Sequence, residues 1–516
     1  MDNELTKVLL IYPDFVSAAS EKRNTGGNWS EGLASISAVL KQGGHKVSLM
    51  HIVYEYDEPT FKEKLKGFDY DLIGISCRTT AFEYVQDLAK WAKEADPDCF
   101  IWIGSYHATI EPEEVIAVPG VDCVCIGEGE YPALELAQRY KSGDYYDIQS
   151  LWFKKPDGEI IRNPVRPLLE NLDELPLPDF DLFDYKNLEC MRLDTALVMM
   201  SRGCLFSCTY CGNSQFRNVY PNKKKYARFR SPENAMLYLE TLLKKFPNIK
   251  FFNFRDAIFN MYDEWFYPFM EMYTERIHLP FTCNLRLDIM TEKTVETLKK
   301  AGCYLIDVGV ESGNEEIRMK YCKRMMTNEQ MINAFSWFHK YDFTTMTYNI
   351  VGLPYETLAK TLETIKLNVQ LNPDKVIPNI FYPYPHTVLA DIASKCGTFP
   401  DVIPADMKVP FYQKDYPPHE VLYASNFFHK YIKRYKRCAK YRPRWLGKLF
   451  EKMYDRRFTS KLVPRKFLNW QYDLRHRAIL RTKRFVIRKM PKLYLFLRRK
   501  RNRIKDNNEA KETKES

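Results

Sequence analysis

The sequence lacks any long apolar segment. No run of apolar residues among its 516 residues approaches the roughly 20 that a helix needs to span a bilayer. The first residues, MDNELTKVLLIYPDF, also lack the features of a secretory leader, because the head is acidic, the apolar run is short, and Pro13 follows without a small-residue cleavage site. We therefore expect an intracellular, cytoplasmic protein.

The cysteines lack the pattern of a disulfide framework. There are 13 of them, an odd number, scattered through a chain that is long enough for two or three domains. This usage fits a reducing compartment and a cluster of metal ligands better than paired disulfides.

Acidic residues are scarce near the C-terminus. Between Lys430 and Lys505 there are 29 Lys and Arg residues and three acids, so this segment carries a net charge of +26. Since the whole chain carries +11, the remainder carries −15. This separation of charge predicts a distinct role for the basic C-terminal region.

The first 150 residues alternate apolar runs with helical segments, and helices are expected at 31–44 and 84–95. Strands are expected at 7–13, 45–50, 70–76, 99–105 and 121–127. Strands that are apolar throughout and alternate with helices predict a parallel sheet covered on both faces. We therefore predict a doubly wound, Rossmann-like α/β domain over residues 1–150, with its ligand at the carboxyl ends of the strands.

A second rhythm of strands and helices follows a proline-rich passage. That passage, 163–181, predicts a linker, which we place at 151–190. Strands are then expected at 195–201, 250–256, 280–286, 304–310, 344–351 and 376–382. Six βα units with this spacing predict a partial (β/α)6 TIM-like barrel over 191–395. A helical, strongly basic region is expected at 396–505 and a disordered tail at 506–516.

Three cysteines lie close together directly after the first barrel strand. Cys204, Cys208 and Cys211 have the spacing C-x3-C-x2-C. Thiolates select zinc, copper or iron–sulfur clusters. Structural zinc normally takes four protein ligands, commonly with a second C-x2-C pair, and no such pair follows here. A [4Fe-4S] cluster can instead be held at three corners by one loop, so the spacing favours it over zinc or over buried cysteines without a metal.

The stretch CLFSCTYC in this position resembles the radical S-adenosylmethionine (SAM) superfamily. The resemblance implies that SAM binds the open iron of the cluster. It also implies that an electron, from a donor such as flavodoxin or ferredoxin, cleaves SAM to a 5′-deoxyadenosyl radical that abstracts hydrogen from the substrate. Tyr210, just before the last cysteine, is assigned to the SAM site on the same basis.

Two segments resemble the later strand motifs of that superfamily. DVGVESG implies that Glu311 and Ser312 contact the ribose or amino-acid part of SAM. YNIVGLPYET implies that the backbone of Val351, Gly352 and Leu353 lies against the adenine. A bland alternative is that Gly352 only relieves crowding at a turn.

Two further residues at the ends of barrel strands are candidates for SAM binding. Arg286 ends the third strand, where its forked guanidinium could pair with a carboxylate, and Asp256 ends the second strand. A structural ion pair between Arg286 and Glu311, or a helix cap by Asp256, are the alternatives. The order of all these motifs, one on each strand, favours the SAM site.

The N-terminal region has a resemblance of its own. GLASISAVLKQGGHKVSLM, YDLIGIS, IWIGSYHATIEPEE and VDCVCIGEGE are similar to the cobalamin (B12)-binding domain that precedes the barrel in one class of radical SAM enzymes. The resemblance implies cobalamin contacts from Ser76, Gly104, Ser105, His107, Ala108, Thr109, Gly127 and Glu128. No histidine lies in the Asp-x-His-x-x-Gly motif that supplies an axial ligand in many cobalamin proteins, and His107 could instead cap a turn.

These resemblances imply a cobalamin-dependent radical SAM enzyme that methylates a carbon or phosphorus centre of a small-molecule or lipid-linked substrate. Oxidative cyclisation, another rearrangement and methylthio transfer are alternatives within the superfamily. Methylthio transfer normally comes with a cysteine-rich N-terminal domain. The N-terminal region here has only isolated cysteines in strands, which counts against methylthio transfer. A zinc-stabilised nucleic-acid-binding module is the alternative from a different class.

Aromatic and aliphatic residues recur among the charges of the basic C-terminal region. Such a helix could lie on an anionic membrane, and peripheral membrane contact is the favoured interpretation. Nucleic-acid binding is disfavoured. The third alternative is that the basic side chains clamp the acidic barrel.

Overall fold

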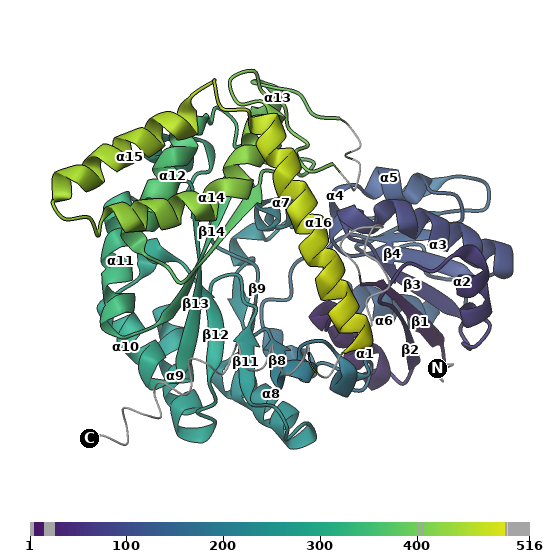
Figure 1. Cartoon of the computed structure of the whole chain (residues 1–516). Coiled ribbons are helices and arrows are strands. Elements are labelled where there is room, and N and C mark those ends of the chain that lie inside the picture. Colours follow the sequence, from purple (N-terminus) through teal and green to yellow (C-terminus); the bar gives the residue numbers. More distant parts are fainter. Residues whose placement is uncertain (1–4, 15–25, 401–402, 404–406, 491–492, 494–516) are drawn as a thin grey trace.

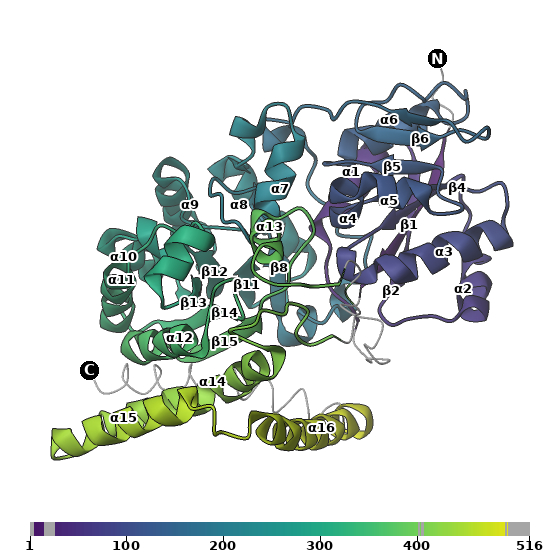
Figure 2. The same ribbon diagram turned by 90° about the horizontal axis from the view of Figure 1, so that it is seen from above.

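A computed structural model gives the fold, and it describes residues 5–14, 26–400, 403, 407–490 and 493. The tail expected to be disordered, 506–516, lies outside these residues. Two large sheets organise the described chain, one on each side of the molecule in Figure 1. A layer of three C-terminal helices lies against the second sheet's domain (Figure 2).

The first sheet confirms the doubly wound N-terminal domain. Its parallel strands are β1 (Lys7–Pro13), β2 (Lys46–Ile52), β3 (Leu72–Ser76), β4 (Phe100–Gly104) and β5 (Cys123–Cys125), in the order β2-β1-β3-β4-β5. Alternate residues of β1 enter two different cores, because Val8 and Leu10 pack in one and Leu9 and Ile11 in the other. The covering helices are α1 (Glu31–Gln42) and α6 (Glu130–Arg139) on one face, and α2 (Glu58–Leu65) and α3 (Phe82–Ala95) on the other.

The first sheet continues past the boundary predicted at residue 150. Strand β6 (Leu151–Lys154) pairs antiparallel with β5, and β7 (Ile160–Arg162) pairs antiparallel with β6. Leu151 and Phe153 are buried in the core of this domain. The two strands cover the edge of β5, so residues 151–162 belong to the sheet and not to the predicted linker.

The second sheet has the predicted six parallel strands. They are β8 (Thr195–Val198), β11 (Phe251–Phe254), β12 (Phe281–Leu285), β13 (Cys303–Glu311), β14 (Thr344–Val351) and β15 (Lys375–Ile380). Each strand pairs with its neighbour in this series, so the sheet is an open, partial barrel. The connecting helices are α8 (Pro232–Lys245), α9 (Asp263–Arg276), α10 (Glu292–Lys300), α11 (Asn328–Lys340) and α12 (Leu358–Leu371). The expected caps at Ser231 and Thr327 are present, the latter as a capping box with Gln330.

Three helices form most of the described part of the C-terminal region. They are α14 (Pro418–Cys438), α15 (Arg444–Thr459) and α16 (Arg465–Lys489). Val421, Phe428 and Tyr431 of α14 share a core with Leu362 and Ile365 of α12, so α14 joins the layer to the barrel. Within the described residues, no helix combines the length and the apolar content that a membrane crossing requires.

Candidate active site between the two domains

The three cysteines occupy one loop that joins β9 (Ser201–Arg202) to α7 (Gly212–Val219). Gly203 fixes the entry to this loop: its φ is +82°, and a Cβ atom there would lie 2.2 Å from the carbonyl oxygen of Tyr226. Asp256 Oδ1, at the end of β11, accepts hydrogen bonds from the Met200 N–H and the Ser201 hydroxyl. The start of the loop is therefore held to the neighbouring barrel strand.

The thiols of Cys204, Cys208 and Cys211 are unpaired and lie within one another's electric field. Burial raises the pKa of the Cys204 and Cys211 thiols, and the neighbouring cysteines add to that effect. The backbone N–H groups of Phe206 and Asn213 act in the opposite direction, on Cys204 and Cys211 respectively. Hydrogen bonds of this kind stabilise thiolates, the form that binds metal.

The arrangement fits an iron–sulfur cluster better than a single metal ion. Among the residues that the structure describes, no group of three or more His, Cys, Asp and Glu side chains is placed to hold one ion. A single zinc, with bonds to sulfur of about 2.3 Å, would draw all three thiolates around one point. A cubane binds each cysteine at a different iron, so its ligands stand further apart. Three free thiols supplied by one loop, with no fourth ligand at hand in the loop, match the second case.

Arg286 lies beside the cysteine loop, with its charge directed at residues other than those expected. Its Nη1 is 3.6 Å from Cys208 Sγ, and its guanidinium stacks 3.6 Å from the ring centroid of Phe206. Its Nε and Nη2 donate to the two carboxylate oxygens of Asp288, at 2.7 and 2.8 Å. The carboxylate that Arg286 pairs with is thus Asp288, and the guanidinium is positioned to donate to a cluster-ligand sulfur.

Tyr210 and Glu311 form a buried polar group with a residue that the sequence reasoning missed, Arg324. The Tyr210 hydroxyl donates to Glu311 Oε1 at 2.9 Å, and Arg324 Nη1 donates to the same hydroxyl at 3.2 Å. Arg324 Nη2 donates to the carbonyl of Gly309 at 2.7 Å. Burial raises the pKa of Glu311, while Arg324 and the Tyr210 hydroxyl lower it. This group ties the end of the cysteine loop to the end of β13.

Two other SAM candidates, Asp256 and Ser312, point into the protein. Both side chains are fully buried. Burial raises the pKa of Asp256 to about 6, and its Oδ2 has no hydrogen-bond partner among the described residues. The Ser312 hydroxyl accepts from the Asn314 N–H at 3.2 Å, and the Ser312 carbonyl accepts from Arg318. These contacts support the ends of β11 and β13.

The backbone expected to contact adenine is held by another missed residue, Glu356. Its Oε2 accepts from the N–H groups of Gly352 and Leu353, at 2.7 and 3.0 Å. The Val351 carbonyl accepts from the Phe381 N–H at 2.9 Å. Gly352 has φ +87°, so a side chain there would be strained. This strand end is rigid because its polar groups are satisfied within the protein.

A cavity of about 300 Å³ lies where the carboxyl ends of β3, β4 and β5 face the barrel domain. Five of the expected cobalamin residues line it: Ser76, Gly104, Ser105, Gly127 and Glu128. On the barrel side its wall includes Met199, Arg202, Gly203, Phe216, Tyr220, Tyr226 and Arg228. Gly203 immediately precedes Cys204, so this cavity adjoins the cysteine loop.

The cavity suits a ligand with hydrogen-bond acceptors. Trp102 lies in its wall, and the buried Nε1 of Trp102 has no hydrogen-bond partner in the described structure. Gly104 leaves open space, because a Cβ atom there would approach only Cys125 Cβ, at 3.5 Å. A second cavity of about 370 Å³ shares Glu128, Glu130, Arg202 and Tyr220 with the first, so the two cavities adjoin along this junction.

The structure does not bring His107, Ala108 and Thr109 to the cavity. They lie in the short helix α4 (Tyr106–Ile110), and all three are buried. The His107 ring packs 4.2 Å from the Phe82 ring, and burial lowers its pKa to about 4. Thr109 Oγ1 accepts a hydrogen bond from the Gly127 N–H at 3.0 Å, so it positions the backbone of a residue that lines the cavity. His107 is therefore a core residue of the N-terminal domain.

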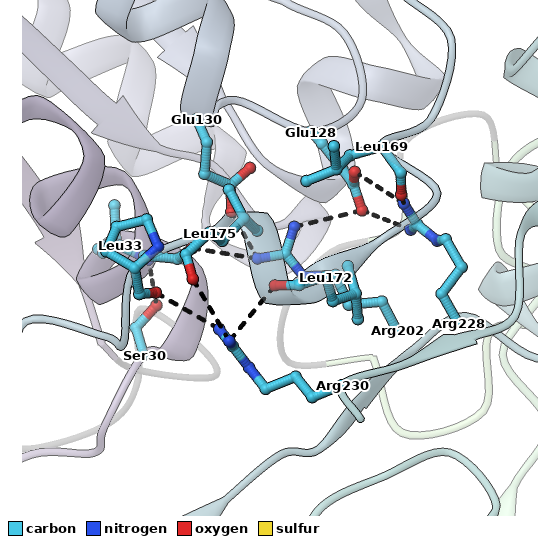
Figure 3. Close-up of polar contacts among 12 residues, drawn as sticks. Ser30, Leu33, Glu128, Glu130, Leu169, Leu172, Leu175, Arg202, Arg228 and Arg230 are labelled. Carbon is cyan, nitrogen blue, oxygen red and sulfur yellow. Dashed lines mark hydrogen bonds and ion pairs between the residues drawn. The ribbon is translucent and has the colours of Figure 1, made fainter. Parts of the chain in front are cut away.

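A network of ion pairs joins the two domains along the cavity wall (Figure 3). Arg202 Nη2 is 2.5 Å from Glu130 Oε1, and Arg202 Nη1 is 3.3 Å from Glu128 Oε1. Arg228 Nη2 donates to the same Glu128 oxygen at 2.6 Å. Burial raises the pKa of Glu130, but Arg202 outweighs it and holds that pKa below its usual value. The acids come from the N-terminal domain and the arginines from the barrel domain, so the charges fix one domain against the other.

Sequence reasoning missed most of this network. Glu128 was a candidate for ligand contact, but Glu130, Arg202 and Arg228 were not singled out. The position of Arg202, two residues before the first cluster cysteine, was the available signal. Arg230, which donates to the carbonyls of Leu172 and Leu175, carried no such signal (Figure 3).

Comparison with known protein families agrees with this geometry. Residues 198–367 match the Radical SAM superfamily, and residues 29–137 match the B12 binding domain. The first match contains the cysteine loop and, in full, four of the six barrel strands, β11 to β14, and the second contains the ends of β3, β4 and β5 that line the cavity. The radical SAM domain implies a [4Fe-4S] cluster and SAM, and the B12-binding domain implies cobalamin.

Several curated proteins are similar to the chain over most of its length. An uncharacterized methyltransferase of Pyrococcus horikoshii is 29% identical, over 76% of this chain and 83% of that protein. The anaerobic magnesium-protoporphyrin IX monomethyl ester cyclase of Rubrivivax gelatinosus is 26% identical, over 74% of this chain and 69% of its own length. The hopanoid C-3 methylase of Methylococcus capsulatus is 26% identical, over 76% of each protein.

Solved structures share the fold. The radical SAM methyltransferase TsrM of Kitasatospora setae, with tryptophan and a SAM analogue bound, aligns with a TM-score of 0.61 and 17% identity over 76% of each chain. The cobalamin-dependent radical SAM enzyme OxsB aligns with a TM-score of 0.61 and 17% identity, over 98% of this chain and 81% of its own. The matches to the Radical SAM superfamily and the B12 binding domain, together with the methyltransferase relative, show that the alternative of a zinc-stabilised nucleic-acid-binding module is wrong. The chain is an enzyme that joins an N-terminal B12-binding domain to a radical SAM domain.

Proposed function

We propose that the protein is a cobalamin-dependent methyltransferase that uses radical SAM chemistry on a carbon or phosphorus centre. The observation that carries this proposal is the position of the cavity. Its walls are the strand ends of the B12-binding domain on one side and Gly203, next to Cys204, on the other. A group held in the cavity and a group held by the cysteines would therefore face the same substrate.

The bound groups supply the reactive chemistry: an electron from the cluster, a radical and a methyl group from SAM, and methyl carriage by cobalamin. The chain's own residues supply binding and order. Cys204, Cys208 and Cys211 hold the cluster, and Arg202 with Glu130 fixes the spacing between the domains. Phe216, Tyr220 and Tyr226 line the cavity with aromatic rings, which exclude water from a reactive radical.

The relatives support methyl transfer and also motivate a second candidate. The names of two of them refer to methyl transfer, one of these to methylation of a hopanoid, which is a lipid. These names favour a small-molecule or lipid-linked substrate here. The cyclase relative favours oxidative cyclisation as the second candidate, because it covers a similar share of the chain. We also propose a flavodoxin- or ferredoxin-type electron donor.

The test is an anaerobic assay of the reconstituted holoenzyme with reduced flavodoxin, SAM deuterated at its methyl group, and a small-molecule and lipid extract as the source of substrate. Methylation predicts both 5′-deoxyadenosine and S-adenosylhomocysteine, together with an extract component that gains a trideuterated methyl group. 5′-Deoxyadenosine without S-adenosylhomocysteine would overturn methylation in favour of cyclisation or another radical outcome. The Cys211→Ala variant should give neither product.

A further inference from the structure

The outer helices of the C-terminal layer expose an unusual number of apolar side chains. Of the 23 large apolar side chains that are exposed among the described residues, 12 lie between Tyr441 and Leu493. They include Trp445 and Trp470, which are 65% and 57% exposed, and Leu462, which is 93% exposed. Exposed apolar residues scattered singly need no explanation, but a concentration in one segment indicates a contact surface.

These side chains follow the helical repeat on both helices. On α15, Trp445, Leu449 and Met453 are spaced by four residues. On α16, the exposed apolar residues Phe467, Trp470 and Leu474 occupy positions i, i+3 and i+7. Residues with these spacings share one face of a helix. We call the set the outer apolar face: Trp445, Leu449, Met453, Phe467, Trp470 and Leu474.

The opposite faces of the same helices pack on the protein. Phe458 of α15 is fully buried against Tyr431 of α14. On α16, Asn469 is buried and donates to the His419 carbonyl at 2.8 Å, and Tyr472 packs against the Phe427 ring. Each helix is therefore oriented, with one side fixed to α14 and the outer apolar face directed away from it.

The charges of α15 and α16 are sorted in the same way. Asp455 pairs with Lys366 of α12 at 2.7 Å, and Asp473 pairs with Lys408 at 3.0 Å. Asp455 and Asp473 therefore contact the rest of the protein, whereas Glu451 pairs with Arg444 of the same helix at 3.3 Å. Among the side chains that the structure describes between Arg444 and Lys489, the following twelve Lys and Arg residues are exposed: Arg444, Lys448, Lys452, Arg456, Arg457, Lys461, Lys466, Arg475, Arg477, Arg481, Lys483 and Lys489.

This sorting does not fit the alternative in which the basic side chains clamp the acidic barrel. In that case the basic groups would be directed inward and paired with acids of the body. Arg465 is the buried exception among the described side chains of this segment, and its partner is Glu420 at the start of α14. Both views show α14, α15 and α16 together as one outer layer of the barrel domain (Figures 1 and 2).

We propose that α15 and α16 form a docking surface for an anionic lipid bilayer, with the outer apolar face in the interface and the exposed basic residues against the lipid headgroups. Tryptophan is enriched at such interfaces, and basic residues beside it add attraction to acidic lipids. A nucleic acid would match the charge but offers no partner for Leu449, Leu462 and Leu474. A second copy docking by this same face would bring two strongly positive surfaces together.

The experiment is flotation of the full-length holoenzyme with vesicles of phosphatidylcholine alone or mixed with phosphatidylserine. We expect binding to the mixed vesicles, weak binding to the neutral ones, and loss of binding at high salt. The variant Trp445→Ser/Leu449→Ser/Trp470→Ser/Leu474→Ser should bind at least about tenfold more weakly, since each buried methylene group contributes to partitioning. The variant Lys448→Glu/Lys452→Glu/Arg475→Glu/Arg477→Glu should lose more, since each cation near the surface contributes about fivefold.

Exposed apolar side chains of the barrel domain provide the matched controls. Leu237 on α8 is 52% exposed and Ile332 on α11 is 39% exposed, so Leu237→Ser/Ile332→Ser should leave vesicle binding unchanged. The proposal is overturned if the apolar variant binds vesicles as well as the natural protein does. It is also overturned if a duplex oligonucleotide binds through the same residues while vesicles do not, or if the substitutions only convert a dimer to a monomer.

Discussion

The two halves of the active site are built in different ways. The cluster half is local: three cysteines within one loop, with Arg286 and the backbone of Phe206 and Asn213 beside their sulfurs. The cobalamin half is assembled: its cavity takes its walls from β1, β3, β4, β5 and the start of α1 in one domain and from α7, β9 and β10 (Arg228–Phe229) in the other. A local site depends on its ligands, whereas an assembled site depends on how the domains are held together.

This difference predicts how each half responds to mutation. Loss of one thiolate should remove the cluster and leave the cavity intact, because the cavity walls on the N-terminal side come from a separate sheet. Blocking the cavity should do the reverse. Weakening the ion pairs between the domains should affect stability before it affects either ligand site.

The largest expected effect is that of Cys208→Ala. With two remaining thiolates the loop cannot hold three corners of a cluster, so iron and sulfide content and the brown absorption should be lost, together with SAM cleavage. Iron analysis and visible spectroscopy of the anaerobically reconstituted protein measure this. Cys396→Ala is the matched control, since Cys396 is half-buried and lies outside the loop, and it should keep the cluster. A full cluster in Cys208→Ala would contradict the assignment.

A smaller effect is expected from Ser76→Trp, which should weaken cobalamin binding and leave the cluster in place. Ser76 ends β3 in the cavity wall, and an indole there would fill much of the roughly 300 Å³ space. We expect cobalamin binding to weaken at least about a hundredfold, because displacing a ligand from a preformed cavity forfeits most of its buried contacts. Equilibrium dialysis with hydroxocobalamin measures this, and the iron content should stay normal. Ser142→Trp, on an exposed turn, is the control and should bind cobalamin normally.

The same difference explains what could be predicted from the sequence. The cysteine loop could be predicted because its three ligands lie close together in the sequence. The strands could be predicted because the strands of a parallel sheet are apolar throughout. The residue Arg286 was found, but its partners were not, because Asp288 and Cys208 become its neighbours only when β12 and the loop meet.

The rest of the site depends on tertiary contacts that leave no periodic signal. Whether His107 faced a ligand or the core depended on the direction of α4, and the structure turns it toward Phe82. The roles of Arg324 and Glu356 arise from loops that fold back on strand ends. The junction between domains is the extreme case, because Arg202 and Glu130 are 72 residues apart in the chain.

The smallest effect is expected from the ion pairs between the two domains. It is also the most direct test of the difference between the local and the assembled half of the site. Glu130→Gln keeps the size of the side chain but removes the charge that Arg202 pairs with, and both groups are largely buried. Removing one partner of a buried ion pair costs about 3 kcal/mol of stability. The matched control is Glu113→Gln: Glu113 pairs with Arg162 at 2.7 Å, but both side chains are about half exposed, so the cost should stay below about 1 kcal/mol.

The pH dependence of this difference separates the ion pair from simple packing. Arg202 holds the pKa of Glu130 below its usual value, so the ionised form is the one that stabilises the fold. That contribution is fully present above the ordinary glutamate pKa of 4.5 and is lost as the pH falls through the lower folded-state pKa. The gap between the natural protein and Glu130→Gln in chemical denaturation should therefore be constant from pH 6 to 8 and shrink only in acid. If the difference in stability persists at a pH where the side chain at position 130 is neutral in both proteins, Glu130 acts through its shape. The domains are then held together by packing and not by charge.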